Sequence, residues 1–221
     1  MAVAFPNTCF NMSPCGNIVL VGLSGAGKTS CAQILAELLD LAVFDSDEII
    51  QRESGRTVSE IFAQEGEPHF RALERKLIEG LLNQDPPLKN TVLSVGGGLP
   101  VYEDNIHLLK KIGFTVFLNA TPSTLARRLA EDLSRDHSLR PLLNQILEDQ
   151  DKNKTESNCK EESRENQVTA EANKNLELRL SELLAGRLKY YEEAHLVIDT
   201  DGKSKQDICR EIQTIIVNNV S

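Results

Sequence analysis

The residues from Gly22 to Thr29 have the types and spacing of a phosphate-binding loop. They read Gly-Leu-Ser-Gly-Ala-Gly-Lys-Thr and fit the pattern Gly-x-x-x-x-Gly-Lys-[Ser/Thr]. Glycines let backbone N–H groups approach phosphate oxygens, and a helix that follows directs its positive end at the same anion. Lys28 is then expected to reach the β- and γ-phosphates of ATP, and the Thr29 hydroxyl to ligate Mg²⁺. The residues expected to bind ATP here are Gly22, Ser24, Gly25, Ala26, Gly27, Lys28, Thr29 and Ser30.

Two carboxylates stand two residues apart in Asp45-Ser46-Asp47. One of them can serve the metal shell, while the other orients a substrate hydroxyl and accepts its proton during phosphoryl transfer. The alternative is that the pair caps the following helix. The triplet Gly96-Gly97-Gly98 is a further candidate, because three glycines permit close approach of a ligand, although they also suit a plain loop.

Three arginines have side chains suited to anions: Arg71, Arg140 and Arg187. A guanidinium group recognises a carboxylate in a bidentate manner and stabilises a transferring phosphate. Each arginine alone is unremarkable, and Arg71 can equally pair with Glu67 or Glu74 on its own helix.

Alternating strand and helix patterns are expected to position these residues. Short apolar runs at 18–23, 41–44, 91–95, 114–118 and 196–198 predict strands, and apolar residues at helical spacing after several of these runs predict helices. This alternation is typical of an α/β fold with a central parallel sheet of about five strands flanked by helices. Ligands bind beyond the carboxyl ends of such strands, so the three candidate loops should meet at one edge.

Local signals mark where several helices begin. Thr57 and Glu60 form a capping-box pattern, and Pro68 suits the first turn of a longer helix. Thr121-Pro122 predicts the start of a helix that continues through Leu129, and residues 204–217 predict a final amphipathic helix.

Composition narrows the class of protein. A formal net charge of -9 over 221 residues argues against general nucleic-acid binding, although a local basic pocket remains possible. The five cysteines are scattered without a C-x-x-C pair, which favours reduced thiols in a cytoplasmic compartment. No apolar run is long enough to cross a membrane. Residues 1–16 lack a transit-peptide signature and are expected to be a disordered leader, with a plastid location left open.

Residues 17–221 are expected to form a single domain. Within it, a lid region at about 133–180 contains a polar insertion at about 148–175, rich in Glu, Lys, Asn and Ser. Such a stretch buries too little apolar surface to offset its ordering entropy, so it is predicted to be flexible or loosely helical.

Taken together, these segments resemble the shikimate kinase family of P-loop small-molecule kinases. The matching segments, in the family's order across about residues 17–200, are GLSGAGKT, FDSDEIIQRESGRTVSEIFAQEGEPHFRALE, SVGGG, LRPLL and GRLKYYEEAHLVIDT. The resemblance implies a P-loop kinase fold with a lid and a substrate-binding helical subregion. It also implies a monomer that phosphorylates the 3-hydroxyl of shikimate with ATP and Mg²⁺ in aromatic amino acid biosynthesis.

The resemblance also implies roles on the phosphate side. Asp45 would belong to the outer shell of Mg²⁺, and Asp47 would bind substrate hydroxyls and act as the base. Arg140 would be a catalytic lid arginine that reaches across substrate and γ-phosphate, and Lys28 would act in catalysis from the phosphate loop. Arg128, in preference to its neighbour Arg127, would stack on the adenine.

On the acceptor side, the resemblance implies that Arg71 and Arg187 clamp the substrate carboxylate, while Gly97 and Gly98 border its ring. The long lid insertion departs from the family, as does Asp201-Gly202-Lys203, which leaves the second adenine contact unassigned. Two alternatives stay open: another P-loop small-molecule kinase such as a gluconate kinase, and a non-catalytic binding module related to shikimate kinase.

Overall fold

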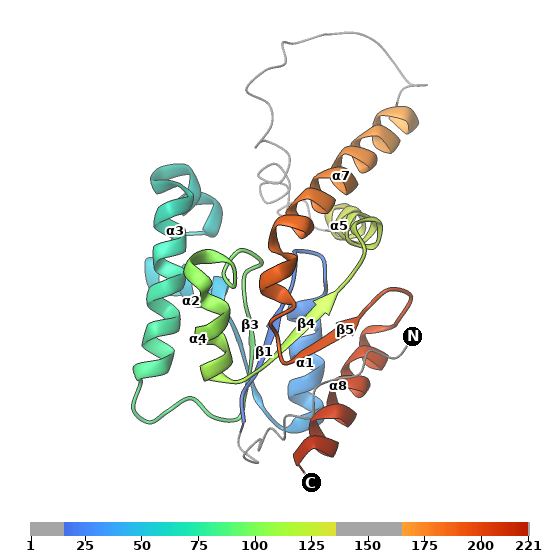
Figure 1. Cartoon of the computed structure of the whole chain (residues 1–221). Helices are drawn as coiled ribbons and strands as arrows, with labels where there is room; N and C mark the ends of the chain where they lie inside the picture. Colours follow the sequence, from blue (N-terminus) through green and yellow to red (C-terminus); the bar gives the residue numbers. More distant parts are fainter. Residues whose placement is uncertain (1–15, 136–164, 221) are drawn as a thin grey trace.

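The computed structural model describes residues 16–135 and 165–220. Within these ranges, five parallel strands form one sheet in the order β2-β3-β1-β4-β5 (Figure 1). The strands are β1 (Ile18–Val21), β2 (Ala42–Asp45), β3 (Thr91–Ser94), β4 (Phe114–Asn119) and β5 (Leu196–Asp199). The expected α/β fold with a parallel sheet of about five strands is confirmed.

Strand β1 lies between β3 and β4 at the centre of the sheet. All its residues are buried, as a continuous apolar run requires when helices cover both faces of a parallel sheet. The strand ends at Val21, earlier than the predicted residue 23. Gly22 has a φ of 143°, and a Cβ there would lie 2.8 Å from the carbonyl oxygen of Leu118. The chain therefore leaves the sheet at the first glycine of the phosphate loop.

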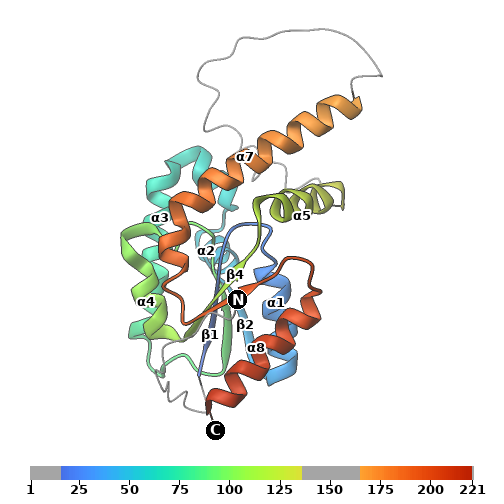
Figure 2. The same ribbon diagram turned by 45° about the vertical axis from the view of Figure 1, so that its right-hand side comes forward.

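Helices cover both faces of the sheet and extend beyond one end of it (Figures 1 and 2). They are α1 (Lys28–Leu39), α2 (Ser46–Ser54), α3 (Val58–Asn83), α4 (Asn105–Ile112), α5 (Pro122–Arg135), α7 (Glu165–Tyr191) and α8 (Lys205–Val220), with a 3₁₀ turn at Tyr102–Asp104. Helices α1 and α8 pack on each other, and α5 packs on α7. Helix α7 reaches from beyond the sheet down onto the central strands (Figure 1).

The predicted starts of helix α3 are confirmed. The Thr57 amide donates to Glu60 Oε2 at 2.7 Å, and the Glu60 amide donates to Thr57 Oγ1 at 3.2 Å. These reciprocal bonds form a capping box. Gly66 then interrupts the helix with φ 80° and ψ 171°, and Pro68 lies in the first turn that follows. The second part of α3 carries Arg71 toward the carboxyl edge of the sheet.

Two helices were missed or underestimated from the sequence. Helix α4 was not predicted, although Ile106, Leu109 and Ile112 are buried at the spacing of one helical face. Helix α5 continues to Arg135, whereas the sequence predicted it through Leu129.

Helix α7 includes the end of the expected polar insertion. Residues 165–175 are helical, as the loosely helical alternative allowed, and they continue into a part of α7 that buries Leu176 and Leu180. A helix packed at one end propagates into polar sequence because each added residue gains one backbone hydrogen bond. The rest of the insertion, the lid from 136 and the leader at 1–15 lie outside the described residues.

Two further sequence expectations bear on the described part. None of its helices combines the length and the apolar character needed to cross a bilayer. Cys31 and Cys209, on α1 and α8, are buried free thiols.

Candidate active site

The loops after β1, β2 and β3 meet at the carboxyl edge of the sheet, as the topology predicted. Thr29 Oγ1, at the start of α1, donates to Asp45 Oδ2 at 3.0 Å. The same hydroxyl lies 3.5 Å from Ser94 Oγ, which the sequence had not singled out. Parallel pairing sets Asp45 beside Ser94 in adjacent strands. Three oxygen-bearing side chains that suit Mg²⁺ therefore converge beside the phosphate loop.

The phosphate loop carries a cation at the start of a helix that no side chain caps. Gly27 is the N-cap of α1, adopts a left-handed φ of 91°, and offers no side-chain bond to the first turn. Lys28 Nζ folds back on the loop and donates to the carbonyl oxygens of Gly22 and Leu23 at 2.9 and 3.0 Å. The first-turn amides and this ammonium group suit a phosphate.

Burial changes the protonation of Lys28. It lowers the pKa of the ammonium group to about 8, although the carboxylates of Asp47 and Asp45 act in the opposite direction. The site therefore holds a cation with less compensating negative charge than its burial requires. ATP would supply that charge. Among the described residues, no group of three or more His, Cys, Asp or Glu could hold a metal alone. Mg²⁺ would thus need ligands from ATP and water besides Thr29.

The two carboxylates of the Asp-x-Asp pair have different environments. Asp45 Oδ1 accepts the Asp47 amide at 3.0 Å and caps α2, so the capping alternative is correct for Asp45. Asp47 Oδ1 accepts the Ser46 hydroxyl at 3.2 Å. Burial and then Asp45 raise the pKa of Asp47, while Lys28 acts to lower it. A carboxylate with a raised pKa is a better proton acceptor than an ordinary aspartate.

Two cavities meet at Asp47. One has a volume of about 560 Å³ and extends along the phosphate loop to Arg128 and Lys205. The other has a volume of about 150 Å³ and is lined by Arg71, Arg187 and the glycine triplet. The residues that line both cavities are Ser24, Asp47, Gly96 and Gly97. Asp47 thus lies at the junction where a group bound in one cavity would react with a group bound in the other.

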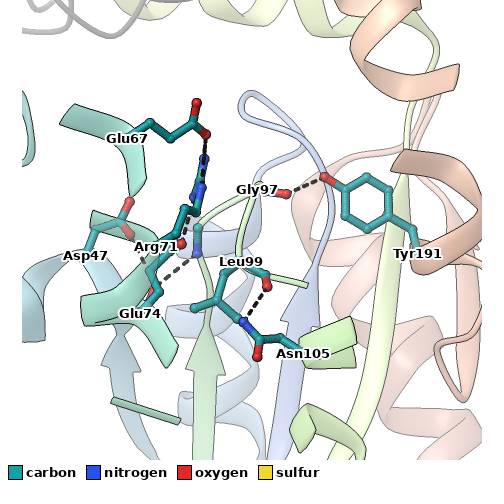
Figure 3. Close-up of polar contacts among 10 residues, drawn as sticks. Asp47, Glu67, Arg71, Glu74, Gly97, Leu99, Asn105 and Tyr191 are labelled. Atoms are coloured by element: carbon teal, nitrogen blue, oxygen red, sulfur yellow. Dashed lines mark hydrogen bonds and ion pairs between the residues drawn. The ribbon is translucent and has the colours of Figure 1, made fainter. Parts of the chain in front are cut away.

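Arg71 pairs with both glutamates that the sequence suggested (Figure 3). Its Nη2 and Nε donate to Glu67 Oε1 at 2.7 and 3.0 Å, and its Nη1 donates to Glu74 Oε2 at 2.7 Å. The side chain is 13% exposed and lines the smaller cavity. A Cβ at position 98 would lie 2.5 Å from Arg71 Nη1. The glycine at 98 is therefore what lets the guanidinium group lie against the triplet loop.

Glu74 was noticed in the sequence only as a possible partner of Arg71. Its side chain is fully buried, and its Oε1 has no hydrogen-bond partner in the described part of the chain. Burial raises the pKa of Glu74 to about 7, although Arg71 acts to lower it. Its position three residues after Arg71, on the core-facing side of α3, was the available signal.

We expect the Glu74→Gln substitution to change how stability depends on pH. The pKa of Glu74 is about 7 in the folded protein and near 4.5 when exposed, so between these values the folded state holds an extra proton. The free energy of unfolding of the parent then falls as pH rises through this window, by up to about 3 kcal/mol. The variant lacks this loss, so its free energy of unfolding relative to that of the parent should increase from pH 4.5 to 7.

Urea titrations of both proteins across pH 4–8 measure that difference. Glu79→Gln, on the same helix but half exposed and paired with Arg75, is the control and should show a much smaller trend. A stability difference between Glu74→Gln and the parent that stays constant with pH would mean that Glu74 titrates normally.

The remaining predicted arginines have distinct positions. Arg187 Nη1 lies 3.6 Å from where a Cβ at Gly97 would be. Arg128 bridges the phosphate loop and the end of β5, donating to the carbonyl oxygens of Ala26 and Thr200 at 3.4 and 2.9 Å. Arg127 instead pairs with Glu131 at the surface. Arg140 lies outside the described residues.

Two further residues at this edge had no role predicted from the sequence. Lys205 Nζ donates to Ser30 Oγ at 2.8 Å and brings α8 into the larger cavity. Tyr191, at the end of α7, donates its hydroxyl to the carbonyl oxygen of Gly97 at 2.6 Å (Figure 3). The spacing of four residues between Arg187 and Tyr191 was the signal that placed both on one helix face.

Comparisons with known proteins show the family of this chain. The family model described as shikimate kinase matches residues 24–217. The chain is 34% identical to the shikimate kinase of Sulfurihydrogenibium sp. over 200 residues, which covers 90% of this chain and 97% of that protein. It is 33% identical to the shikimate kinase of Geobacter metallireducens over 196 residues, 89% of each chain.

Solved structures give the same result. Shikimate kinase from Acinetobacter baumannii in complex with shikimate superposes with a TM-score of 0.70 at 31% identity, covering 97% of this chain and 98% of that one. Shikimate kinase from Bacteroides thetaiotaomicron superposes with a TM-score of 0.67 at 26% identity, covering 92% of this chain and 99% of the other.

Proposed function

The chain belongs to the shikimate kinase family, and we propose that it transfers the γ-phosphoryl group of ATP to the 3-hydroxyl of shikimate. The observation that carries this proposal is the position of Asp47 at the junction of the two cavities. On one side of Asp47 lies a phosphate loop with a buried lysine, and on the other lie Arg71 and Arg187. This arrangement suits a phosphate donor and a small hydroxylated acid as acceptor.

On the donor side, the loop amides and Lys28 bind the phosphates and offset the charge that develops during transfer. Thr29 would hold Mg²⁺ with Asp45 in the outer shell, and the bound ion would neutralise charge on the β- and γ-phosphates. The contact between Thr29 and Asp45 at 3.0 Å supports this assignment. Arg128 would border the adenosine, and Arg140 would reach the γ-phosphate from the lid.

On the acceptor side, Asp47 orients the 3-hydroxyl and accepts its proton. The hydroxyl oxygen then forms a bond to the γ-phosphorus as the bond from that phosphorus to the bridging oxygen of ADP breaks. Arg71 and Arg187 would bind the carboxylate, and Gly97 and Gly98 would border the ring. Fixing both reactants in this way removes much of the entropic barrier to transfer. We further propose a monomer that works in the cytoplasm.

Measurement of ADP release with a coupled assay tests the function directly. The purified protein with ATP and Mg²⁺ should release ADP when shikimate is added and not when gluconate is added. Turnover of gluconate in place of shikimate would favour the other kinase class. Absence of turnover with either acid, in a folded protein that binds ATP, would favour a non-catalytic module.

The Arg71→Ala substitution should raise the KM for shikimate by about 30-fold or more, with little change in the KM for ATP. The reason is loss of a charge-assisted contact to the carboxylate. Steady-state kinetics with each substrate varied measures both constants. Arg52→Ala, at an exposed position on α2, is the control and should change neither. An equal rise in both constants would indicate that Arg71 only supports the fold.

A further inference from the structure

Tyr191 is a buried phenol whose hydroxyl contacts the glycine loop that borders the smaller cavity. Its side chain is fully buried at the end of α7, and its ring stacks on Phe117 of β4 with centroids 5.0 Å apart. The hydroxyl donates to the carbonyl oxygen of Gly97 at 2.6 Å (Figure 3). Burial raises the pKa of Tyr191, although Arg187 acts to lower it. The phenol therefore remains a hydrogen-bond donor across the neutral range.

This bond sets the direction of a peptide group at the acceptor cavity. The only cis peptide in the described residues is Asp85-Pro86, so the bond between Gly97 and Gly98 is trans. In a trans peptide the C=O and N–H groups point in opposite directions. With the Gly97 carbonyl held toward Tyr191, the Gly98 amide points away from it. Gly98 has no side chain to restrict its backbone, so the Tyr191 bond adds to the turn bond from the Leu99 amide to the Gly96 carbonyl in holding this peptide plane.

The same residue sets the position of an arginine. Arg187 lies four residues before Tyr191 on α7, and residues at this spacing share a helix face about one turn apart. Arg187 Nη1 lies 3.6 Å from the Cβ position at Gly97, the residue that Tyr191 holds. The helix ends at Tyr191, so its last turn is held to the loop through this hydrogen bond and to β4 through the ring contact with Phe117.

We propose that Tyr191 is a positioning residue for the acceptor carboxylate. Its hydrogen bond to Gly97 orients the Gly97–Gly98 peptide and places Arg187 beside it, so that both face the smaller cavity in a defined arrangement. This inference rests on the proposed function and deepens it by naming the contact that aligns the acceptor side. It concerns one hydroxyl group, which can be removed without changing the ring that fills the core.

Tyr191→Phe tests the proposal. The variant should raise the KM for shikimate about tenfold and change kcat and the KM for ATP by less than about twofold, because the partly buried Gly97 carbonyl loses the hydrogen bond from the Tyr191 hydroxyl. Titration calorimetry with shikimate should show the same loss of affinity without turnover. If Tyr191 acts through Arg187, combining Tyr191→Phe with Arg187→Ala should cost less than the sum of the single effects.

Two control variants separate the hydroxyl from general packing. Tyr190→Phe alters the neighbouring tyrosine, whose ring lies under Lys189 Nζ at 4.7 Å and lines neither cavity, and it should leave both KM values unchanged. Phe117→Leu removes the stacking partner of Tyr191 and keeps the hydroxyl. It should lower the melting temperature with a smaller effect on the KM for shikimate than Tyr191→Phe.

Several results would overturn the positioning role. An unchanged KM for shikimate in Tyr191→Phe, with or without a lower melting temperature, would mean that the hydroxyl serves only packing. An equal rise in both KM values would mean general loosening of the site, as would an equal shikimate effect in Phe117→Leu. If the parent protein binds shikimate but does not turn it over, calorimetry still decides the proposal. If the parent does not bind shikimate, the proposed function fails and the positioning role fails with it.

Discussion

The Asp47→Asn substitution should lower kcat with shikimate by about 10²- to 10⁴-fold, because a positioned proton acceptor contributes rate of this size. The asparagine side chain keeps the shape and can still hydrogen bond a hydroxyl, so shikimate affinity should change much less than kcat. The pKa of Asp47 is raised mainly by burial. Removing a buried charge there should therefore leave the melting temperature unchanged or higher. Steady-state kinetics and thermal unfolding of the same preparation measure both effects.

Glu48→Gln is the matched control for this variant. Glu48 is the next residue along α2, and its side chain is exposed, so the substitution removes one carboxylate without touching either cavity. Its kcat should equal that of the parent. A kcat for Asp47→Asn within about tenfold of the parent would contradict the assignment of Asp47 as base and would favour a role in positioning alone.

The Lys28→Met substitution should lower kcat by about 10³-fold or more, since it removes a preorganised cation from the transferring phosphate. The substitution should leave the stability of the fold unchanged or raise it. The pKa of Lys28 is about 8 in the folded protein and 10.5 when exposed. Below pH 8 the buried charge therefore opposes folding, and this cost is relieved as pH rises from 8 to 10.5. Methionine has a similar length and no charge, so the melting temperature at pH 7 should not fall.

Activity and melting temperature of Lys28→Met at pH 7 are the quantities to measure. Lys111→Met, at an exposed position in the last turn of α4, is the control and should retain parental activity. A variant that lost activity together with its cooperative unfolding would show that Lys28 supports the loop by its bonds to Gly22 and Leu23. Retained activity in the variant would show that Lys28 is not a catalytic residue.

The local structures that the sequence predicted correctly are those encoded by contiguous residues. The phosphate loop, the capping box at Thr57 and the helix start after Gly66 depend on backbone rules that act within a few residues. The convergence of the Asp-x-Asp pair, the glycine triplet and the phosphate loop was also predicted, because a parallel sheet brings its carboxyl ends together whatever the details of packing.

The parts that required the structure are contacts between distant segments. Arg127 and Arg128 both line the larger cavity, and which of them reaches the phosphate loop depends on how α5 is rotated about its axis. The structure shows Arg128 bonded to Ala26 and Thr200, so its preference over Arg127 as the adenine contact stays a prediction. Glu74 and Tyr191 have ordinary residue types at ordinary helix positions. Their importance follows from complete burial beside Arg71 and Gly97, and burial is a property of the packed molecule.

By itself, the sequence predicted a phosphate loop and a parallel sheet around it, because periodicity, turn chemistry and motif spacing are local properties, and its motifs resembled those of the shikimate kinase family. The tertiary structure decided what the loop faces: a second cavity joined to the first at Asp47, with Arg71 held between two glutamates and the glycine triplet held by Tyr191. The physical reason is that hydrogen bonds and pKa shifts in the site depend on burial and on distances of a few ångströms between elements far apart in the chain, which no local pattern specifies.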